Sequence, residues 1–218
     1  MEPEFWHQRW RTGQIGFHQS SPHPFLERWW PTLGLPKGSR VYVPMCGKSL
    51  DMVWLAVRGY LVVGSELSPI AVAEFFGEQH IPVDVRTHGP FRRHAAGAFE
   101  ILEGDALALT AHLLGPVRAA YDRAALVALP ADLRVGYAKQ FADLMPAGSK
   151  SLLVGFEYDE ARKPGPPFSV DAQEVERLYG SAFEIKPLER VDIIDSSPKF
   201  AAAGVVELFE TLYELTRR

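Results

Sequence analysis

Apolar positions along the chain follow two patterns, short runs rich in β-branched residues and longer segments with helical spacing. The short runs are typical of buried strands, which we predict over residues 40–44, 61–66, 99–102, 119–122 and 151–158. Helical spacing predicts helices over residues 50–58, 69–79 and 132–145. Strands that alternate with helices in this way predict crossover connections and a parallel sheet covered by helices on both faces. The pattern therefore indicates an α/β fold.

Residues that start and stop helices support two of these predictions. Ser68 is an N-cap residue and Pro69 a favourable first-turn residue for the second helix, and Gly59 is a C-cap residue after the first. The segment 204–216 near the end of the chain fits a helix about as well as a strand. Periodicity alone leaves both assignments open there.

Three short segments rich in proline, glycine or serine indicate surface loops, at residues 20–24, 87–97 and 163–168. Each is short enough to connect elements within one domain. A length of 218 residues is ordinary for one α/β domain. We therefore predict a single domain over residues 1–218, in which residues 1–35 form a lid and helix segment packed on the rest.

Charge and cysteine content narrow the class of partner. The chain has 23 basic and 27 acidic residues, a net charge of -4, and offers no basic face for nucleic acid or an anionic membrane. Cys46 is the one cysteine, and the start MEPEFWHQRW has the character of neither a signal peptide nor a transit peptide. No apolar run approaches a membrane span in length, and no metal site is indicated. We expect a cytoplasmic protein that acts on a small molecule.

The loop after the first predicted strand, in VPMCGKSLDM, contains the tripeptide Gly47-Lys48-Ser49 found in phosphate-binding P-loops. A P-loop needs a glycine five positions before its second glycine, and Tyr42 occupies that position. The sequence therefore disfavours a phosphate site. Lys48 is then expected to be a solvated surface lysine, and Cys46 a small packing residue.

An acidic residue, Glu66, ends the second predicted strand twenty positions after Cys46. This is the spacing at which a carboxylate accepts hydrogen bonds from the hydroxyls of an adenosine ribose, although a helix-flanking acid is the other interpretation. The loop contains one glycine, Gly47, where a dinucleotide fingerprint has three. An adenosine cofactor without a pyrophosphate, of which S-adenosylmethionine is the common example, fits better.

Several strings resemble the thiopurine S-methyltransferase family of S-adenosylmethionine-dependent methyltransferases. They are FWHQRWRTGQIGFH, VPMCGKSLDM, LVVGSELS, AYDRAALVALP, PGPPFSV and LYELT, and together they span nearly the whole chain. The resemblance implies a Rossmann-like sheet of seven strands, mostly parallel, with an antiparallel last strand, so that 204–216 would be largely strand. It also implies a monomeric cytosolic enzyme, a thiopurine S-methyltransferase with S-adenosylmethionine as cofactor.

The resemblance also implies cofactor contacts, each with an interpretation of its own. The contacts fall on Trp10, Met45, Glu66, Asp105, Ala106 and Arg123. Asp105 follows a strand and could accept from an adenine amino group, or cap the helical turn after it. Arg123 could pair with the carboxylate of the cofactor's methionine or an anionic substrate, or form an internal ion pair with Asp122 or cap a helix.

Aromatic residues around two glycines in the first seventeen residues indicate a loop able to close over a site. In the family this segment presents a phenylalanine to the acceptor, and Phe17 is the matching position. His18 could orient or deprotonate the acceptor or be purely structural, and Asp122 and Arg123 are further candidates for handling its proton. The resemblance implies a second arginine near the acceptor, and Lys199 stands at the corresponding place as a candidate for substrate binding, where it keeps the charge without the bidentate fork.

The resemblance implies an aromatic or heterocyclic thiol as acceptor, and bacterial-type members are also linked to selenium and tellurium compounds. Two alternatives remain. A related methyltransferase of halide or thiocyanate ions shares the sheet and the ribose acid, and a protein without catalysis could use the same pocket to sense the cofactor and regulate a partner. An oxidoreductase that uses NAD is disfavoured by the missing glycines.

Overall fold

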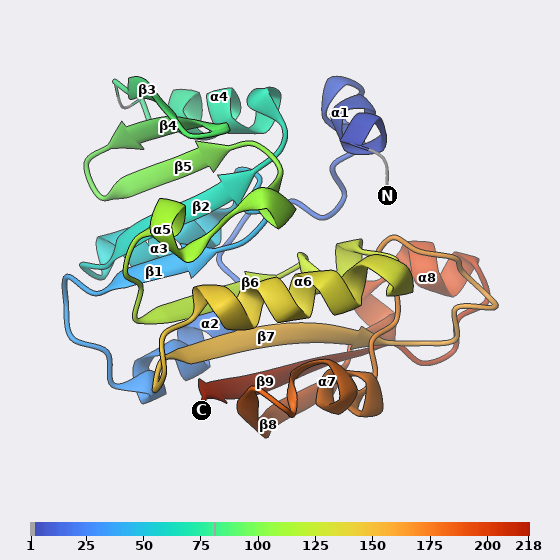
Figure 1. Ribbon diagram of the computed structural model, residues 1–218. Coiled ribbons are helices and arrows are strands. Elements are labelled where there is room, and N and C mark those ends of the chain that lie inside the picture. The colour runs from blue at the N-terminus through green and yellow to red at the C-terminus, as the bar shows by residue number, and fades with distance from the viewer. Residues whose placement is uncertain (1–2, 81) are drawn as a thin grey trace.

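The computed structural model describes residues 3–80 and 82–218, which form one continuous sheet with helices on both faces (Figure 1). The strands are β1 Arg40–Val43, β2 Leu61–Glu66, β3 Asp84–His88, β4 Phe91–Ala96, β5 Phe99–Glu103, β6 Ala119–Arg123, β7 Lys150–Glu157, β8 Phe183–Asp192 and β9 Phe209–Arg217. The helices are α1 Pro3–Arg11, α2 Pro24–Trp29, α3 Leu50–Val57, α4 Pro69–Glu78, α5 Ala111–Leu114, α6 Ala131–Leu144, α7 Ala172–Tyr179 and α8 Pro198–Ala202.

The order of strands confirms the predicted fold class. Within the described residues the order is β3-β4-β5-β2-β1-β6-β7-β9-β8. The seven strands from β5 to β8 form the predicted sheet, in which β9 alone runs in the direction opposite to the other six. The segment 204–216 is therefore strand from Phe209 onward, because its backbone pairs with β7 on one side and β8 on the other. Leu212 and Leu215 are buried in the two apolar layers on opposite faces of the sheet.

The predicted loop at residues 87–97 is wrong, because most of it belongs to the antiparallel hairpin β3–β4, which extends the sheet beyond β5. Turn-forming residues are frequent in the sequence of residues 87–97, which is why it resembles a loop. Gly89 has a φ of +59°, which the turn between the two strands requires. Between the glycines, however, Phe91, His94 and Ala96 are buried while Arg92 is exposed. This partial alternation is the signature of a strand.

Two apolar layers fix the helices to the sheet. Tyr137 and Phe141 of α6 and Tyr179 of α7 pack on one face, and the cluster that includes Leu55 of α3 and Phe75 of α4 packs on the other. Figure 1 shows α6 in front of β6 and β7, with α2 and α3 behind the sheet. The carboxyl ends of the parallel strands consequently meet at one edge, where α1 and α8 also lie, and ligands of such sheets bind at this edge.

No helix in the part of the chain that the structure describes has the length and apolar character needed to cross a membrane.

Candidate functional site at the carboxyl edge of the sheet

The loop between β1 and α3 is tied to the end of β2 by its backbone. Cys46 donates its backbone N–H to the carbonyl of Ser65 at 2.9 Å, and Gly47 donates to Oε2 of Glu66 at 2.8 Å. Met45 and Gly47 have positive φ angles of 44° and 52°. Strained backbone of this kind at a non-glycine residue such as Met45 clusters at ligand sites, so the loop is a candidate binding element.

The side chains of this loop exclude a phosphate site. Lys48, predicted to be a solvated surface lysine, is instead mostly buried, and its Nζ lies 2.9 Å from Glu74 and 2.6 Å from Glu78 of α4. Ser49 caps α3 by accepting from Asp51 N. Cys46 is buried in the apolar layer, which confirms its predicted packing role, and burial raises the pKa of its thiol. The lysine and hydroxyl that a P-loop offers to phosphate are thus engaged within the protein.

Glu66 presents a buried carboxylate to this edge of the sheet. Besides the bond from Gly47, its Oε1 accepts the backbone N–H of Ser68 at 2.7 Å, so it does contact the start of α4 as the helix-flanking interpretation requires. Burial raises the pKa of Glu66, while these backbone donors oppose the rise. Among the described residues no cation lies within ion-pair distance of it. Each oxygen keeps a lone pair for a hydroxyl donor from a ligand.

Trp10 of α1 closes over the same loop. Its side chain is buried, and a Cβ added to Gly47 would lie 3.1 Å from the Trp10 ring. Phe17 packs edge-on against Trp10 at 5.6 Å and against Trp6 at 5.8 Å between ring centroids. The structure therefore brings Trp10, Phe17 and the cofactor-loop candidates together, with the aromatic rings covering the loop.

Replacing Gly47 with alanine is expected to destabilise the fold by about 1–2 kcal/mol and to weaken ligand binding at the loop, because the new Cβ combines a positive φ with a contact on the Trp10 ring. Gly38→Ala is the matched control, since Gly38 has a φ of +80° with no atom within 4 Å of an added Cβ. Urea unfolding measures the free energy of unfolding of both variants, and the loss should be larger for Gly47→Ala. An equal loss in both variants would show that the approach of Trp10 contributes nothing.

Arg123 is held by a carboxylate that the sequence did not single out. Its Nε donates to Oδ2 of Asp51 at 2.8 Å, and Oδ1 of Asp51 accepts the backbone N–H of His23 at 2.8 Å. Burial by itself lowers the pKa of Arg123, but the adjacent Asp51 carboxylate reverses this, so the net shift is upward. The Arg123 guanidinium therefore stays charged at the carboxyl edge. Its contact with Asp51 uses Nε, so the nitrogens Nη1 and Nη2 are not part of this ion pair.

The suggested ion pair between Arg123 and Asp122 is wrong, because successive residues of a strand point to opposite faces. Asp122 is buried against α6, where it accepts from the Tyr137 hydroxyl at 2.6 Å and from Leu126 N at 3.2 Å. Burial raises the pKa of Asp122 to about 6. The structure does not bring Asp122 to Phe17 or the lid.

This burial predicts a pH dependence of stability. The pKa of Asp122 is about 6 in the folded protein against 3.8 as the reference value, so folding favours the protonated form. The contribution of Asp122 to the free energy of unfolding is complete below the pKa of the unfolded state, and it is lost as pH rises through about 6. Between pH 5 and 7.5 the loss is on the order of 1 kcal/mol.

We expect Asp122→Asn, which cannot titrate, to remove this part of the pH dependence. The check is urea unfolding of both proteins at pH 5 and 7.5, and the wild-type free energy of unfolding should fall more than that of the variant. Parallel curves for the two proteins would contradict the assignment.

Asp105 and Ala106 lie after β5, at the next strand end along the edge. Asp105 accepts the backbone N–H of Leu107 at 2.9 Å, which confirms the cap interpretation for one of its oxygens. Ala106 is buried, and its carbonyl accepts from Nε2 of Gln140 at 2.6 Å. Gln140 of α6 was not identified from sequence, because one polar residue within a helical pattern carries no signal of such a long-range contact.

His18 belongs to the lid segment, and Lys199 approaches this segment from α8. Desolvation lowers the pKa of His18, and the positive charges of Lys48 and Arg123 lower it further, so its imidazole is neutral at pH 7. Lys199 of α8 places Nζ 3.2 Å from the position of a Cβ on Gly16, next to Phe17. The fold thus brings Lys199 against Gly16, the residue before Phe17, although the two lie far apart in the sequence.

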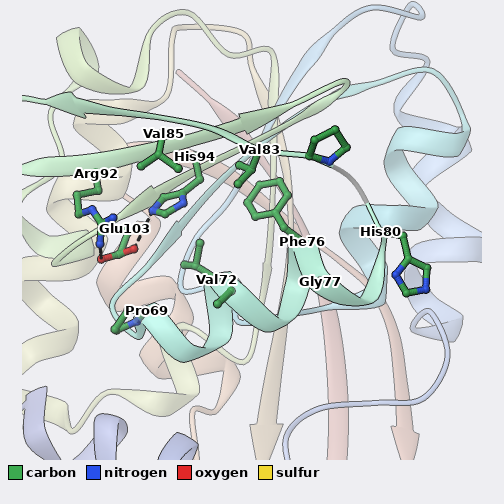
Figure 2. Close-up of a pocket in the computed structure, with 12 residues that line it drawn as sticks. Pro69, Val72, Phe76, Gly77, His80, Val83, Val85, Arg92, His94 and Glu103 are labelled. Carbon is green, nitrogen blue, oxygen red and sulfur yellow. Dashed lines mark hydrogen bonds and ion pairs between the residues drawn. The ribbon is translucent and has the colours of Figure 1, made fainter.

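A groove of about 740 Å³ lies elsewhere, between α4 and the hairpin β3–β4 (Figure 2). Phe76 of α4 lines it, and His94 pairs with Glu103 across its floor at 2.7 Å. None of the predicted site residues lines this groove. The candidate site is therefore the lidded edge rather than this open groove.

Comparisons with known proteins identify the family of this chain. The chain matches the family model described as "Thiopurine S-methyltransferase (TPMT)" over residues 1–218. A protein named thiopurine S-methyltransferase from Pseudomonas fluorescens is 47% identical over 215 residues and covers 99% of both chains. One of the same name from Azotobacter vinelandii is 46% identical over 218 residues and covers 100% of both.

Solved structures support the fold. An S-adenosylmethionine-dependent methyltransferase from Thiobacillus denitrificans, in complex with S-adenosylhomocysteine, has a TM-score of 0.63 at 14% identity and covers 97% of this chain and 98% of its own. A methyltransferase from Anabaena variabilis has a TM-score of 0.66 at 15% identity and covers 99% and 95%. These solved structures show a shared fold, whereas the identity and coverage of the sequence relatives show the family. The chain belongs to the thiopurine S-methyltransferase family.

Proposed function

We propose that this protein transfers the methyl group of S-adenosylmethionine to the sulfur of an aromatic or heterocyclic thiol, with thiopurines among its acceptors. Membership of the family supports this activity, as do the names of full-length relatives at 46 and 47% identity. The observation that carries the proposal is Glu66, a buried carboxylate without a cation partner in the described structure. A pair of neighbouring ribose hydroxyls supplies the two donors that its free lone pairs require.

The residues at the edge fit such a cofactor. Positive φ angles at Met45 and Gly47 open the loop backbone next to Glu66, and Trp10 covers it. When bound, the cofactor supplies a methyl group on a positively charged sulfur. The residues that we propose to hold it are Trp10, Met45, Glu66, Asp105, Ala106 and Arg123.

The lid suits an acceptor that approaches a cationic donor. Phe17 and Trp10 present aromatic rings that exclude water, and methyl transfer from a sulfonium to a thiolate neutralises charge, so it gains from a dry site and from alignment. We assign Phe17 and Lys199 to acceptor binding. No strong base is needed for a thiol whose pKa is already near neutral.

Control of the acceptor's proton falls to two residues at the edge. The charge of Arg123, kept by Asp51, lowers the pKa of a thiol nearby and favours the thiolate. His18 offers a neutral imidazole that can accept the proton. Asp122 faces α6, so its assigned role is to position the turn after β6 rather than to touch the acceptor.

Other parts of the sequence interpretation stay predictions. These are one catalytic domain over residues 1–218, a monomer, a cytoplasmic location, and activity on selenium or tellurium compounds.

The test is methyl transfer from labelled S-adenosylmethionine to 6-mercaptopurine, iodide and selenite in parallel. Labelled methyl on mercaptopurine, at a rate well above iodide, is the expected result. Preference for iodide would favour the halide alternative. Calorimetric binding of S-adenosylhomocysteine without transfer to any acceptor would favour a regulator that senses the cofactor.

A further inference from the structure

The loop between β1 and α3 is anchored to the end of β2 at three successive backbone N–H groups. Gly47 donates to the Glu66 carboxylate at 2.8 Å. Cys46 donates to the main-chain carbonyl of Ser65 at 2.9 Å, and Met45 donates to Oγ of the same serine at 3.4 Å. The anchor of Met45 is therefore a side-chain hydroxyl, which a substitution can remove without a change to the main chain.

Met45 has the backbone conformation that most needs such an anchor. Its φ of 44° lies in the left-handed region, which is less favourable for a residue with a Cβ than for a glycine such as Gly47. A hydrogen bond to the N–H of Met45 holds the peptide group that enters this residue. The Ser65 hydroxyl is thus placed to stabilise the conformation that opens the loop backbone next to Glu66.

A buried tyrosine contacts this hydroxyl. Tyr42 of β1 pairs in register with Val63 of β2, and Ser65 lies two residues further along on the same face of the sheet. The Tyr42 hydroxyl lies 2.9 Å from Oγ of Ser65, and both side chains are buried. Burial raises the pKa of Tyr42, so its hydroxyl stays protonated. Whichever hydroxyl donates, Oγ of Ser65 keeps a lone pair for the N–H of Met45.

Other buried hydroxyl groups in the sheet and helices are not connected in this way. Oγ of Ser151 in β7 and the hydroxyl of Tyr179 in α7 are buried without a hydrogen-bond partner among residues 3–80 and 82–218. The pair of Tyr42 and Ser65 differs because it reaches the backbone of a loop at the carboxyl edge. The tyrosine at the position of a P-loop glycine is therefore linked to the loop as well as to the core.

We propose that Ser65 and Tyr42 are positioning residues for the cofactor. Ser65 holds the backbone of Met45 in the conformation that receives the cofactor, and Tyr42 holds the Ser65 hydroxyl in the orientation that accepts from Met45. Both act through Met45 rather than by contact with the ligand. The inference rests on the proposed function, because it takes this loop as the site of S-adenosylmethionine, and it adds a residue pair that sets the affinity.

Calorimetry with S-adenosylhomocysteine measures this affinity without turnover. Ser65→Ala removes the acceptor, and we expect binding about tenfold weaker than in wild type, because a backbone N–H loses its partner. Tyr42→Phe keeps the acceptor but not its orientation and should weaken binding by about threefold. Because Tyr42 acts through Ser65, the double variant should show the loss of about tenfold seen in Ser65→Ala, and not the product of about thirtyfold.

Matched controls make the same changes at hydroxyl groups without a partner. Ser151→Ala and Tyr179→Phe should keep the affinity within about twofold of wild type. Steady-state rates separate positioning from a general loss of stability. Ser65→Ala should raise the KM for S-adenosylmethionine with kcat within about twofold of wild type, whereas a variant that is only less stable loses active protein and keeps its KM.

Amide exchange reports on the anchor itself. The chain has four methionines, so labelling with ¹⁵N-methionine gives few amide signals. The amides of Met52 and Met145 donate to backbone carbonyls and serve as internal references. Ser65→Ala should speed the exchange of the Met45 amide with solvent by about tenfold, relative to these two.

Three outcomes overturn the inference alone. They are an affinity of Ser65→Ala within about twofold of wild type, a loss of affinity without faster exchange at Met45, and an additive loss of about thirtyfold in the double variant. If wild type does not bind S-adenosylhomocysteine at all, the proposed function fails and the inference fails with it.

Discussion

Glu66→Gln is expected to weaken the binding of S-adenosylhomocysteine by about 100-fold. An amide presents one acceptor oxygen where the carboxylate presents two, and hydrogen bonds to a charged group contribute about 1.5–3 kcal/mol each. In the wild type, the carboxylate accepts the backbone N–H groups of Gly47 and Ser68. In the variant, the amide nitrogen is a donor and would face one of these two N–H groups without a hydrogen bond. Isothermal titration calorimetry measures the affinity, and circular dichroism and urea unfolding establish that the variant is folded.

Glu103→Gln is the matched control for this experiment. Glu103 ends β5, the strand beside β2, and it is similarly shielded but pairs with His94. Its replacement should leave the affinity within about twofold of wild type, because it faces the groove of Figure 2 and not the loop. A folded Glu66→Gln protein that binds as tightly as wild type would refute the assignment of Glu66.

Asp51→Asn is expected to destabilise the protein by about 3 kcal/mol, because it leaves Arg123 buried without its counter-ion. The amide can still accept from His23 N, so the loss is specific to the ion pair. Urea unfolding at pH 7 measures it, with Asp143→Asn, an exposed position on α6, expected to stay within about 0.5 kcal/mol of wild type.

A double-mutant cycle isolates the pair further. Arg123→Gln removes the buried charge, so the combined variant should lose less free energy of unfolding than the sum of the two single variants. Additive losses would show that Asp51 does not hold Arg123. In the same series, Asp51→Asn should lower kcat/KM for 6-mercaptopurine, since a guanidinium without its partner is no longer fixed at the edge.

The fold was largely predictable because its main signals are local. Apolar runs such as 61–66 and the cap at Ser68 specify a strand and a helix start without reference to the rest of the chain. The hairpin β3–β4 was missed because its turn residues outweighed a partial alternation. The last strand needed the family resemblance, since only its neighbours β7 and β8 distinguish it from a helix.

The positions of Glu66, Arg123 and Trp10 at the carboxyl edge were predictable, because each ends a strand or lies in a motif, and their roles in binding stay predictions. The surroundings were not, because they depend on contacts between distant segments. Asp51 forms an ion pair with Arg123, and Lys48 forms ion pairs with two glutamates of α4. The spacing of these residues in the sequence does not predict either pairing.

The most direct test of the central claim is to identify the atom that receives the methyl group. Purified protein is incubated with S-adenosylmethionine labelled with ¹³C in the methyl group and with 6-mercaptopurine, and carbon NMR of the product distinguishes a methyl on sulfur from one on a ring nitrogen. We predict S-methylmercaptopurine as the labelled product, formed at a lower rate by Glu66→Gln. Transfer to nitrogen, or no transfer by a protein that binds S-adenosylhomocysteine, would contradict the account.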